Sequence, residues 1–253
     1  MVDDYLHKAL SLQRIGDHKG AEKALTVLLE KAPNDPDALH LLGLSLHAQG
    51  HSRKAAEKIA LAISILPGQA MFHTHAGVVA VSMGDLDLAA KQYEAAIDCD
   101  PKYIDAYANY GALLEASGFC EDALTVLNQG LALDKTSVGI LVNRGKVLAK
   151  LGRFTEAEAS YRGALEVDPD VAEAYNNLGN LLKRGKRYEE AATAFEAALT
   201  VRPGFLEAQY NKALALAGAG NVDVADQILE ELIAEQPEPH FFIARAGLME
   251  AVP

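Results

Sequence analysis

Residues 172–191 read AEAYNNLGNLLKRGKRYEEA and are followed by Phe195 and Pro203, and this stretch shows the folding pattern most clearly. Its apolar and small residues recur at helical spacing in two blocks, which indicates two short helices joined by a turn. The small residues Gly179 and Ala191 let the two helices approach each other closely. The stretch therefore predicts an antiparallel helical hairpin.

The hairpin recurs along the whole chain with a period of 34 residues. Its most regular position is an alanine, which occurs seven times, as Ala21, Ala55, Ala89, Ala123, Ala157, Ala191 and Ala225. Another small residue lies twelve positions earlier, as Ala9, Gly43, Gly77, Gly111, Gly145, Gly179 and Ala213. Prolines keep the same period at Pro33, Pro67, Pro101, Pro169, Pro203 and Pro237, and Lys135 takes the remaining place. The period is therefore unbroken.

The quoted stretch resembles the tetratricopeptide repeat, whose signature places aromatic, Leu-Gly, large, Ala, aromatic and Pro residues at fixed offsets. These offsets hold Tyr175, Leu178, Gly179, Leu182, Ala191, Phe195 and Pro203. The resemblance covers residues 2–237, although no repeat has the family's Trp. It implies an all-α fold, a right-handed superhelical solenoid of seven 34-residue helical hairpins plus a C-terminal helix.

The period also sets the expected organisation of the chain. The seven repeats are 2–35, 36–69, 70–103, 104–137, 138–171, 172–205 and 206–237. Residues 238–253 form a partial eighth repeat or a capping helix, and they fit either a solvating end or the front part of a longer protein. Because each hairpin buries its apolar face only against its neighbours, we expect one array without separate domains.

Glycines between the two helices of each hairpin predict where the first helix ends. They are Gly16, Gly50, Gly84, Gly118, Gly152 and Gly220. A left-handed residue commonly closes a helix, and glycine adopts that conformation without steric cost. In the sixth repeat the glycine moves one place, to Gly185.

Composition excludes several classes of protein. A formal net charge of -12 argues against a nucleic-acid partner, which requires an excess of Lys and Arg. Cys99 and Cys120 stand alone, as in a reducing compartment, and no secretory signal opens the chain, so we expect a cytoplasmic protein. Residues 59–84 lack charged side chains, but Pro67 and Gly68 interrupt them. They predict two buried helices and no membrane insertion.

Motifs for catalysis are missing from the sequence. It contains no HExxH, GxSxG or Walker-type GxxxxGK motif, and its Cys and His residues lack metal-ligand spacing. His40, His47 and His75 have no carboxylate or thiolate that completes a metal site. We therefore expect a chain that is not an enzyme by itself and uses neither cofactor nor metal.

In the family that the chain resembles, the first helices line a concave groove, and this implies a peptide-binding surface. One inner offset holds four successive asparagines, Asn109, Asn143, Asn177 and Asn211. A carboxamide both donates and accepts, so it can bind a peptide backbone without reading side chains. The structural alternative is that these asparagines bond to an adjacent helix. We expect an extended protein segment as the partner.

The same inner offsets predict two further surfaces. Near the asparagines Asn176 and Asn180 the fifth and sixth repeats contribute four cations, Lys146, Lys150, Lys183 and Arg184, which favour an acidic partner. Toward the N-terminus the inner offsets become apolar, with Leu6, Leu10, Leu41, Leu44 and Val78. That half predicts a hydrophobic anchor pocket or a self-association surface.

The asparagine ladder also resembles the helical arms of O-linked N-acetylglucosamine transferases and of their bacterial relatives, including flagellin-modifying enzymes. That resemblance implies a substrate-recruiting arm of a larger glycosyltransferase, although nothing in the sequence supplies a sugar-nucleotide site. The alternative is a free-standing adaptor that assembles a multiprotein complex.

Overall fold

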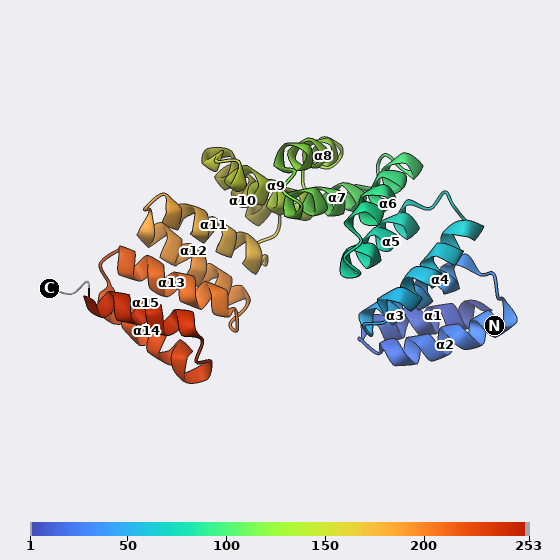
Figure 1. Cartoon of the computed structure of the whole chain (residues 1–253), viewed down its shortest axis with the longest axis horizontal. Coiled ribbons are helices and arrows are strands. Elements are labelled where there is room, and N and C mark those ends of the chain that lie inside the picture. Colours follow the sequence, from blue (N-terminus) through green and yellow to red (C-terminus); the bar gives the residue numbers. More distant parts are fainter. Residues whose placement is uncertain (1, 251–253) are drawn as a thin grey trace. The chain divides into compact units, whose positions relative to one another are not determined.

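The computed structural model describes residues 2–250, and the side chains of residues 4–248. Its helices form two compact units, which divide between Asp134 and Lys135 (Figure 1). Every regular element among residues 2–250 is an α-helix, so the expected all-α fold is confirmed.

The first unit contains four helical hairpins. Its helices are α1 (Val2–Arg14), α2 (His18–Lys31), α3 (Pro36–Ala48), α4 (Ser52–Ile65), α5 (Ala70–Ser82), α6 (Leu86–Cys99), α7 (Ile104–Ala116) and α8 (Cys120–Leu133). The uncharged stretch at residues 59–84 forms the end of α4, a turn and α5, as predicted. Within the described residues, no helix is long and apolar enough to cross a membrane.

The second unit contains three hairpins and a final helix. Its helices are α9 (Val138–Lys150), α10 (Phe154–Val167), α11 (Ala172–Arg184), α12 (Tyr188–Val201), α13 (Leu206–Gly218), α14 (Val222–Glu235) and α15 (Pro239–Glu250). Helix α15 lies in the segment 238–253 that was predicted as a partial repeat or a cap, and residues 251–253 lie outside the described part.

Aspartate side chains cap the N-terminal ends of some helices. The Asp35 carboxylate accepts from the backbone N–H of Ala38 at 2.9 Å, and Pro36 occupies the first turn of α3. Asp85 caps α6 in the same way through the N–H of Leu88, at 3.0 Å. These side chains satisfy backbone donors that a helix leaves unpaired at its beginning.

The small-residue positions form the core of each hairpin. All seven alanines of the ladder that begins at Ala21 have an exposed fraction of 0%. The glycines opposite them form sockets for large side chains of the second helix. A Cβ atom added to Gly179 would lie 2.6 Å from Cε1 of Phe195. The paired helices can approach so closely because these positions carry no larger side chain.

The turn of the sixth hairpin differs from our expectation. The six glycines predicted to end the first helices, from Gly16 to Gly220, have φ between 77° and 87°, but Gly185 has φ of -78°. The left-handed residue of this turn is Lys186, with φ of 60°. The prediction that Gly185 is the left-handed residue that ends α11 is therefore wrong. The left-handed position recurs every 34 residues even here, where the residue is not a glycine and its backbone conformation is therefore unfavourable.

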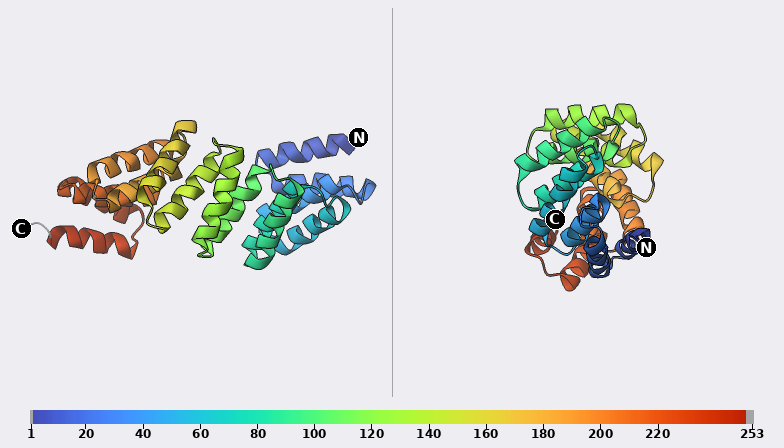
Figure 2. Two further views of the ribbon diagram at one scale, coloured as in Figure 1. Left: turned by 90° about the horizontal axis from the view of Figure 1, so that it is seen from above. Right: turned by 90° about the vertical axis from the view of Figure 1, so that its right-hand side faces the viewer.

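First helices of successive hairpins contact each other inside each unit. In the first unit α1 contacts α3, α3 contacts α5, and α5 contacts α7; in the second, α9 contacts α11, α11 contacts α13, and α13 contacts α15. Among the described residues, second helices of successive hairpins make no comparable contact. The first helices therefore form the inner surface of each unit. Figure 2 shows the succession of paired helices in two further orientations.

Candidate functional site

The inner surface of the second unit carries two unpartnered polar atoms on α11. Asn176 is 3% exposed, and its Oδ1 atom has no hydrogen-bond partner among the described residues. The Nδ2 atom of the neighbouring Asn177 is buried and also unpartnered in that part of the chain. A buried polar group without a partner costs about 1–3 kcal/mol. Both atoms are screened from solvent, so a ligand can bond to them only after neighbouring side chains move.

A polar cluster links α11 to α13 beside those atoms. Asn176 Nδ2 donates to Glu207 Oε1 at 3.1 Å, and Lys183 Nζ donates to Asn211 Oδ1 at 2.6 Å. Burial lowers the pKa of Lys183, and the nearby charge of Glu207 raises it. Sequence reasoning missed Glu207, although it occupies one of the inner offsets. Part of the expected positive charge is therefore compensated within the cluster.

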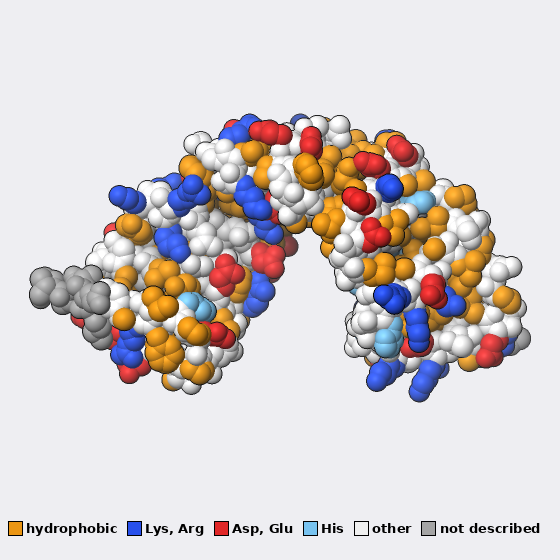
Figure 3. Space-filling model, in the orientation of Figure 1, with side chains coloured by type: hydrophobic (Ala, Val, Ile, Leu, Met, Phe, Trp, Pro, Cys, Tyr) orange, Lys and Arg blue, Asp and Glu red, His pale blue; other side chains and the backbone are white. Residues whose placement is uncertain are grey.

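The remaining cations of this surface differ in their surroundings. Arg184 is exposed, and its guanidinium lies over the ring of Phe154, with its carbon 4.6 Å from the ring centroid. Such stacking holds the charge in place while leaving it accessible. Lys146 is half-buried on α9, and Lys150 is exposed at the end of the same helix. Figure 3 shows Lys and Arg side chains spread over the helices of the second unit.

The predicted asparagine ladder divides between the two units. Asn143, Asn177 and Asn211 lie on α9, α11 and α13 of the second unit, whereas Asn109 lies on α7 of the first. Asn109 Nδ2 donates to the backbone oxygen of Asp105 at 2.7 Å, within its own helix. Asn211 is 7% exposed and is bonded to Lys183. Bonds within the protein thus already engage Asn109 and Asn211, and peptide binding by the ladder stays a prediction. Asn180 is half-buried on α11, next to them.

The apolar residues predicted for the inner surface of the N-terminal half differ in how far they are buried. Leu6, Leu41 and Leu44 are half-buried against the core, whereas Leu10 is 43% exposed. Val78 lines a pocket of about 280 Å³ between α5, α6 and α7. Figure 3 shows hydrophobic side chains over the helices of this unit.

Two histidines of the first unit pair with each other. His40 Nε2 and His75 Nδ1 lie 2.7 Å apart, so one of these nitrogens donates to the other, and Phe72 stacks on the His40 ring. Burial, with a smaller contribution from His75, lowers the pKa of His40 to about 3. Burial also lowers the pKa of His75, against the opposing charge of Asp105. Within the described residues, no group of three or more His, Cys, Asp or Glu side chains could hold a metal ion.

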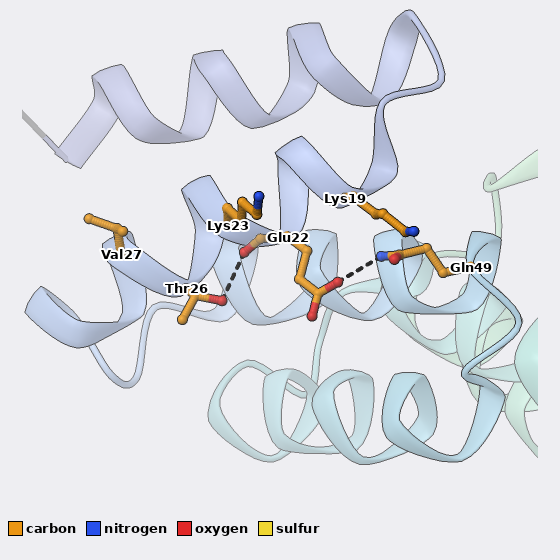
Figure 4. Close-up of a pocket in the computed structure, with 6 residues that line it drawn as sticks. All are labelled: Lys19, Glu22, Lys23, Thr26, Val27 and Gln49. Carbon is orange, nitrogen blue, oxygen red and sulfur yellow. Dashed lines mark hydrogen bonds between the residues drawn. The ribbon is translucent and has the colours of Figure 1, made fainter.

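A larger pocket of about 500 Å³ lies on α2, outside the inner surface (Figure 4). Its lining residues are Lys19, Glu22, Lys23, Thr26, Val27 and Gln49. Gln49 Nε2 donates to the Glu22 carboxylate at 2.8 Å and so ties the first two hairpins together. Because Lys19, Lys23 and Thr26 are exposed, the pocket is a shallow outer surface and not a preformed binding site.

The chain belongs to the tetratricopeptide repeat family. A family model described as tetratricopeptide repeat matches residues 6–70, 75–138 and 142–204, and a second model with that description matches residues 181–248. This assignment agrees with the paired helices and with the buried alanine ladder.

Comparison with a curated protein gives a partial match. The protein is described as the probable UDP-N-acetylglucosamine–peptide N-acetylglucosaminyltransferase SPINDLY of Hordeum vulgare, and it is 29% identical over 138 residues. The match covers 52% of this chain and 15% of that relative. The chain therefore corresponds to a small part of the relative's length.

Two solved structures share the fold. The structure of the APC/C hetero-tetramer Cut9–Hcn1 gives a TM-score of 0.80 at 17% identity, over 98% of this chain and 48% of that one. YrrB, described as a TPR protein with an unusual peptide-binding site, gives a TM-score of 0.55 at 21% identity, over 76% of this chain and 98% of that one. At these identities the similarity establishes the fold alone.

Proposed function

We propose that this chain is a protein-interaction scaffold whose inner first-helix surface binds an extended protein segment. The observation that carries the proposal is the pair of unpartnered carboxamide atoms on Asn176 and Asn177, which a small side-chain movement would expose to a ligand. An extended peptide offers a C=O and an N–H at short intervals, and a carboxamide can pair with either group. The similarity to YrrB, whose description names a peptide-binding site, supports the same class of ligand.

The charges of this surface favour an acidic segment. Lys146, Lys150 and Arg184 lie on α9 and α11, in a protein with a formal net charge of -12. A local reversal of sign steers a partner of opposite charge and accelerates its association. Hydrogen bonds contribute only about 0.5–1.5 kcal/mol each, whereas association costs about 4–15 kcal/mol. The asparagines must therefore act together with these cations or with apolar contacts.

The test begins with peptides selected from a random library on the full chain. For acidic binders we expect Asn177→Ala to weaken affinity about two- to tenfold, because one net hydrogen bond is lost. Asn221→Ala is the matched control, since Asn221 is exposed and its side chain does not cap α14. Calorimetric titration measures the affinity, and circular dichroism confirms folding. Unchanged affinity in a folded Asn177→Ala variant would assign this residue to helix packing.

A second arm of the experiment tests the charges. Lys146→Glu with Arg184→Glu should slow association of the acidic peptides, and added salt should weaken the wild-type complex. Arg53→Glu with Lys91→Glu makes the same change in net charge at two exposed positions on the second helices α4 and α6 of the first unit. Equal association rates in both double variants would contradict electrostatic steering.

At a finer level, we propose that the scaffold is the substrate-recruiting arm of a larger glycosyltransferase. The partial match to the SPINDLY protein supports this assignment. The alternative is a free-standing adaptor that assembles a multiprotein complex, which the same repeat surface would also serve. Sequencing the gene on both sides of this segment separates the two: an adjoining glycosyltransferase domain supports the arm, and an open reading frame without one supports the adaptor.

A further inference from the structure

The pocket between α5, α6 and α7 has the size and lining of a site for one side chain. Its volume of about 280 Å³ lies just below the roughly 300–1,000 Å³ of pockets that enclose whole small molecules. Its lining is largely aliphatic or aromatic and consists of Val78, Val81, Leu86, Tyr93, Asn109, Ala112, Leu113, Ala116 and Ser117. Val81 and Leu86 are 42% and 45% exposed, so the pocket opens to solvent.

Two polar groups accompany this apolar lining. Asn109 donates through Nδ2 to the backbone of its own helix, which fixes the carboxamide and leaves Oδ1 to accept from a ligand. Tyr93 is 2% exposed and lies against the socket of Gly77. Burial raises the pKa of Tyr93 to about 12, further above neutral pH than the ordinary value. A backbone N–H beside an inserted side chain is the donor that matches the Asn109 oxygen.

The surroundings of the pocket are acidic. Residues 70–134 contain ten Asp and Glu residues and only two lysines. Asp105 lies one turn before Asn109 on α7, and Asp85 directly precedes Leu86 on α6. A ligand with positive charge next to its apolar side chain is therefore complementary to this part of the first unit.

We propose that this pocket is a specificity site for a protein segment that inserts one large apolar side chain flanked by lysine or arginine. Asn109 Oδ1 accepts the backbone N–H next to the inserted residue. The inference rests on the proposed scaffold function and adds a sequence requirement to it. It separates this pocket from the inner surface of the second unit, whose cations favour acidic segments.

The same random peptide library on the full chain tests the requirement. We expect a class of binders that share one Leu, Met, Ile or Phe with Lys or Arg within two positions. Replacing that apolar residue by Ala in a labelled peptide should weaken binding about tenfold or more by fluorescence polarisation, since burying such a side chain is worth at least one factor of ten. Replacing the basic flank by Glu should also weaken binding.

Variants of the protein locate the site. Ala112→Leu fills the pocket and should abolish binding of this class, while Ala60→Leu adds the same atoms at an exposed position of α4 and should leave it unchanged. Val81→Asp places a charge at an exposed lining position and should also abolish binding of this class, which keeps the test valid if Ala112→Leu unfolds. Neither change should affect acidic peptides that depend on Arg184.

The outcomes are distinguishable. A set of binders that lacks the anchored basic class altogether, or anchored binders that tolerate both Ala112→Leu and Val81→Asp, overturns this inference while the scaffold function stands. A library that yields no binder on the folded chain contradicts both the specificity site and the scaffold proposal.

Discussion

Gly179 shows how closely the two helices of a hairpin pack. The ring of Phe195 occupies the space that a side chain at this position would need. The same relation joins Gly77 to Tyr93 and Gly145 to Tyr161, always sixteen residues apart. The sequence period was sufficient to predict that these positions are small, because small residues at a fixed interval indicate close helix approach.

We expect Gly179→Ala to lower the free energy of unfolding by about 1–3 kcal/mol, because the new methyl group overpacks the socket. Gly139→Ala is the matched control. Gly139 has no atom within 4 Å of an added Cβ and lies in the first turn of α9, so alanine there should leave stability unchanged or raise it by less than about 1 kcal/mol. Urea unfolding followed by circular dichroism measures both changes. Equal stability of the two variants would show that the socket can yield.

The pair of His40 and His75 makes stability depend on pH. The folded-state pKa of His40 is about 3, well below the value near 6.5 that the unfolded chain has. Between these values the unfolded chain binds more protons than the folded protein. The unfolding free energy should therefore fall as the pH falls from about 6.5 toward 3, by about 1.4 kcal/mol per pH unit for His40, with a contribution of the same sign from His75.

Thermal melting of wild type and His40→Leu between pH 7 and pH 4 tests this dependence. The variant should show a smaller slope in this range, whereas His51→Gln, at an exposed position, should keep the wild-type slope. An identical slope in all three proteins would mean that His40 does not titrate as its burial implies. The pairing itself was not predictable, since only the packing of α3 against α5 brings residues 35 positions apart together.

At the scale of the elements, the helices follow from the sequence more closely than the turns do. Each predicted pair of helices is present, because the apolar and small residues repeat at helical spacing. The turn after α11 differs from the prediction, because the position of a glycine does not by itself decide which residue is left-handed. The neighbouring helices instead fix the left-handed position at Lys186.

Lys186→Gly tests this account of the turn. A non-glycine residue in the left-handed conformation costs about 1–2 kcal/mol, and glycine removes this cost. Glycine also has greater freedom in the unfolded chain, which offsets part of the stabilisation. We expect a net stabilisation of roughly 0.5–1 kcal/mol in urea unfolding. Gly185→Ala, where φ is negative, should change stability much less than Gly152→Ala, where φ is 77°. The opposite order would place the left-handed residue at Gly185.

At the scale of the whole molecule, charge distinguishes the two units. Residues 1–134 carry 10 Lys and Arg against 18 Asp and Glu, and residues 135–253 carry 13 against 17. The sequence revealed where cations gather on the first helices of the second unit. It could not reveal that Lys183 is bonded to Asn211, or that Tyr93, Asn109 and Ala112 line one pocket, because these relations depend on side-chain conformations across separate hairpins.

The sockets have a consequence for how such a chain can change in length. Each socket glycine of the ladder Gly43, Gly77, Gly111, Gly145 and Gly179 contacts a residue of its own hairpin, sixteen positions later. Unequal recombination that duplicates or removes 34 residues, from one turn to the next, therefore leaves every socket with its own aromatic, leucine or isoleucine side chain. Gene lineages of this kind can gain or lose hairpins while the helix pairing of the survivors is preserved, and the choice of bound segments can diversify with hairpin number.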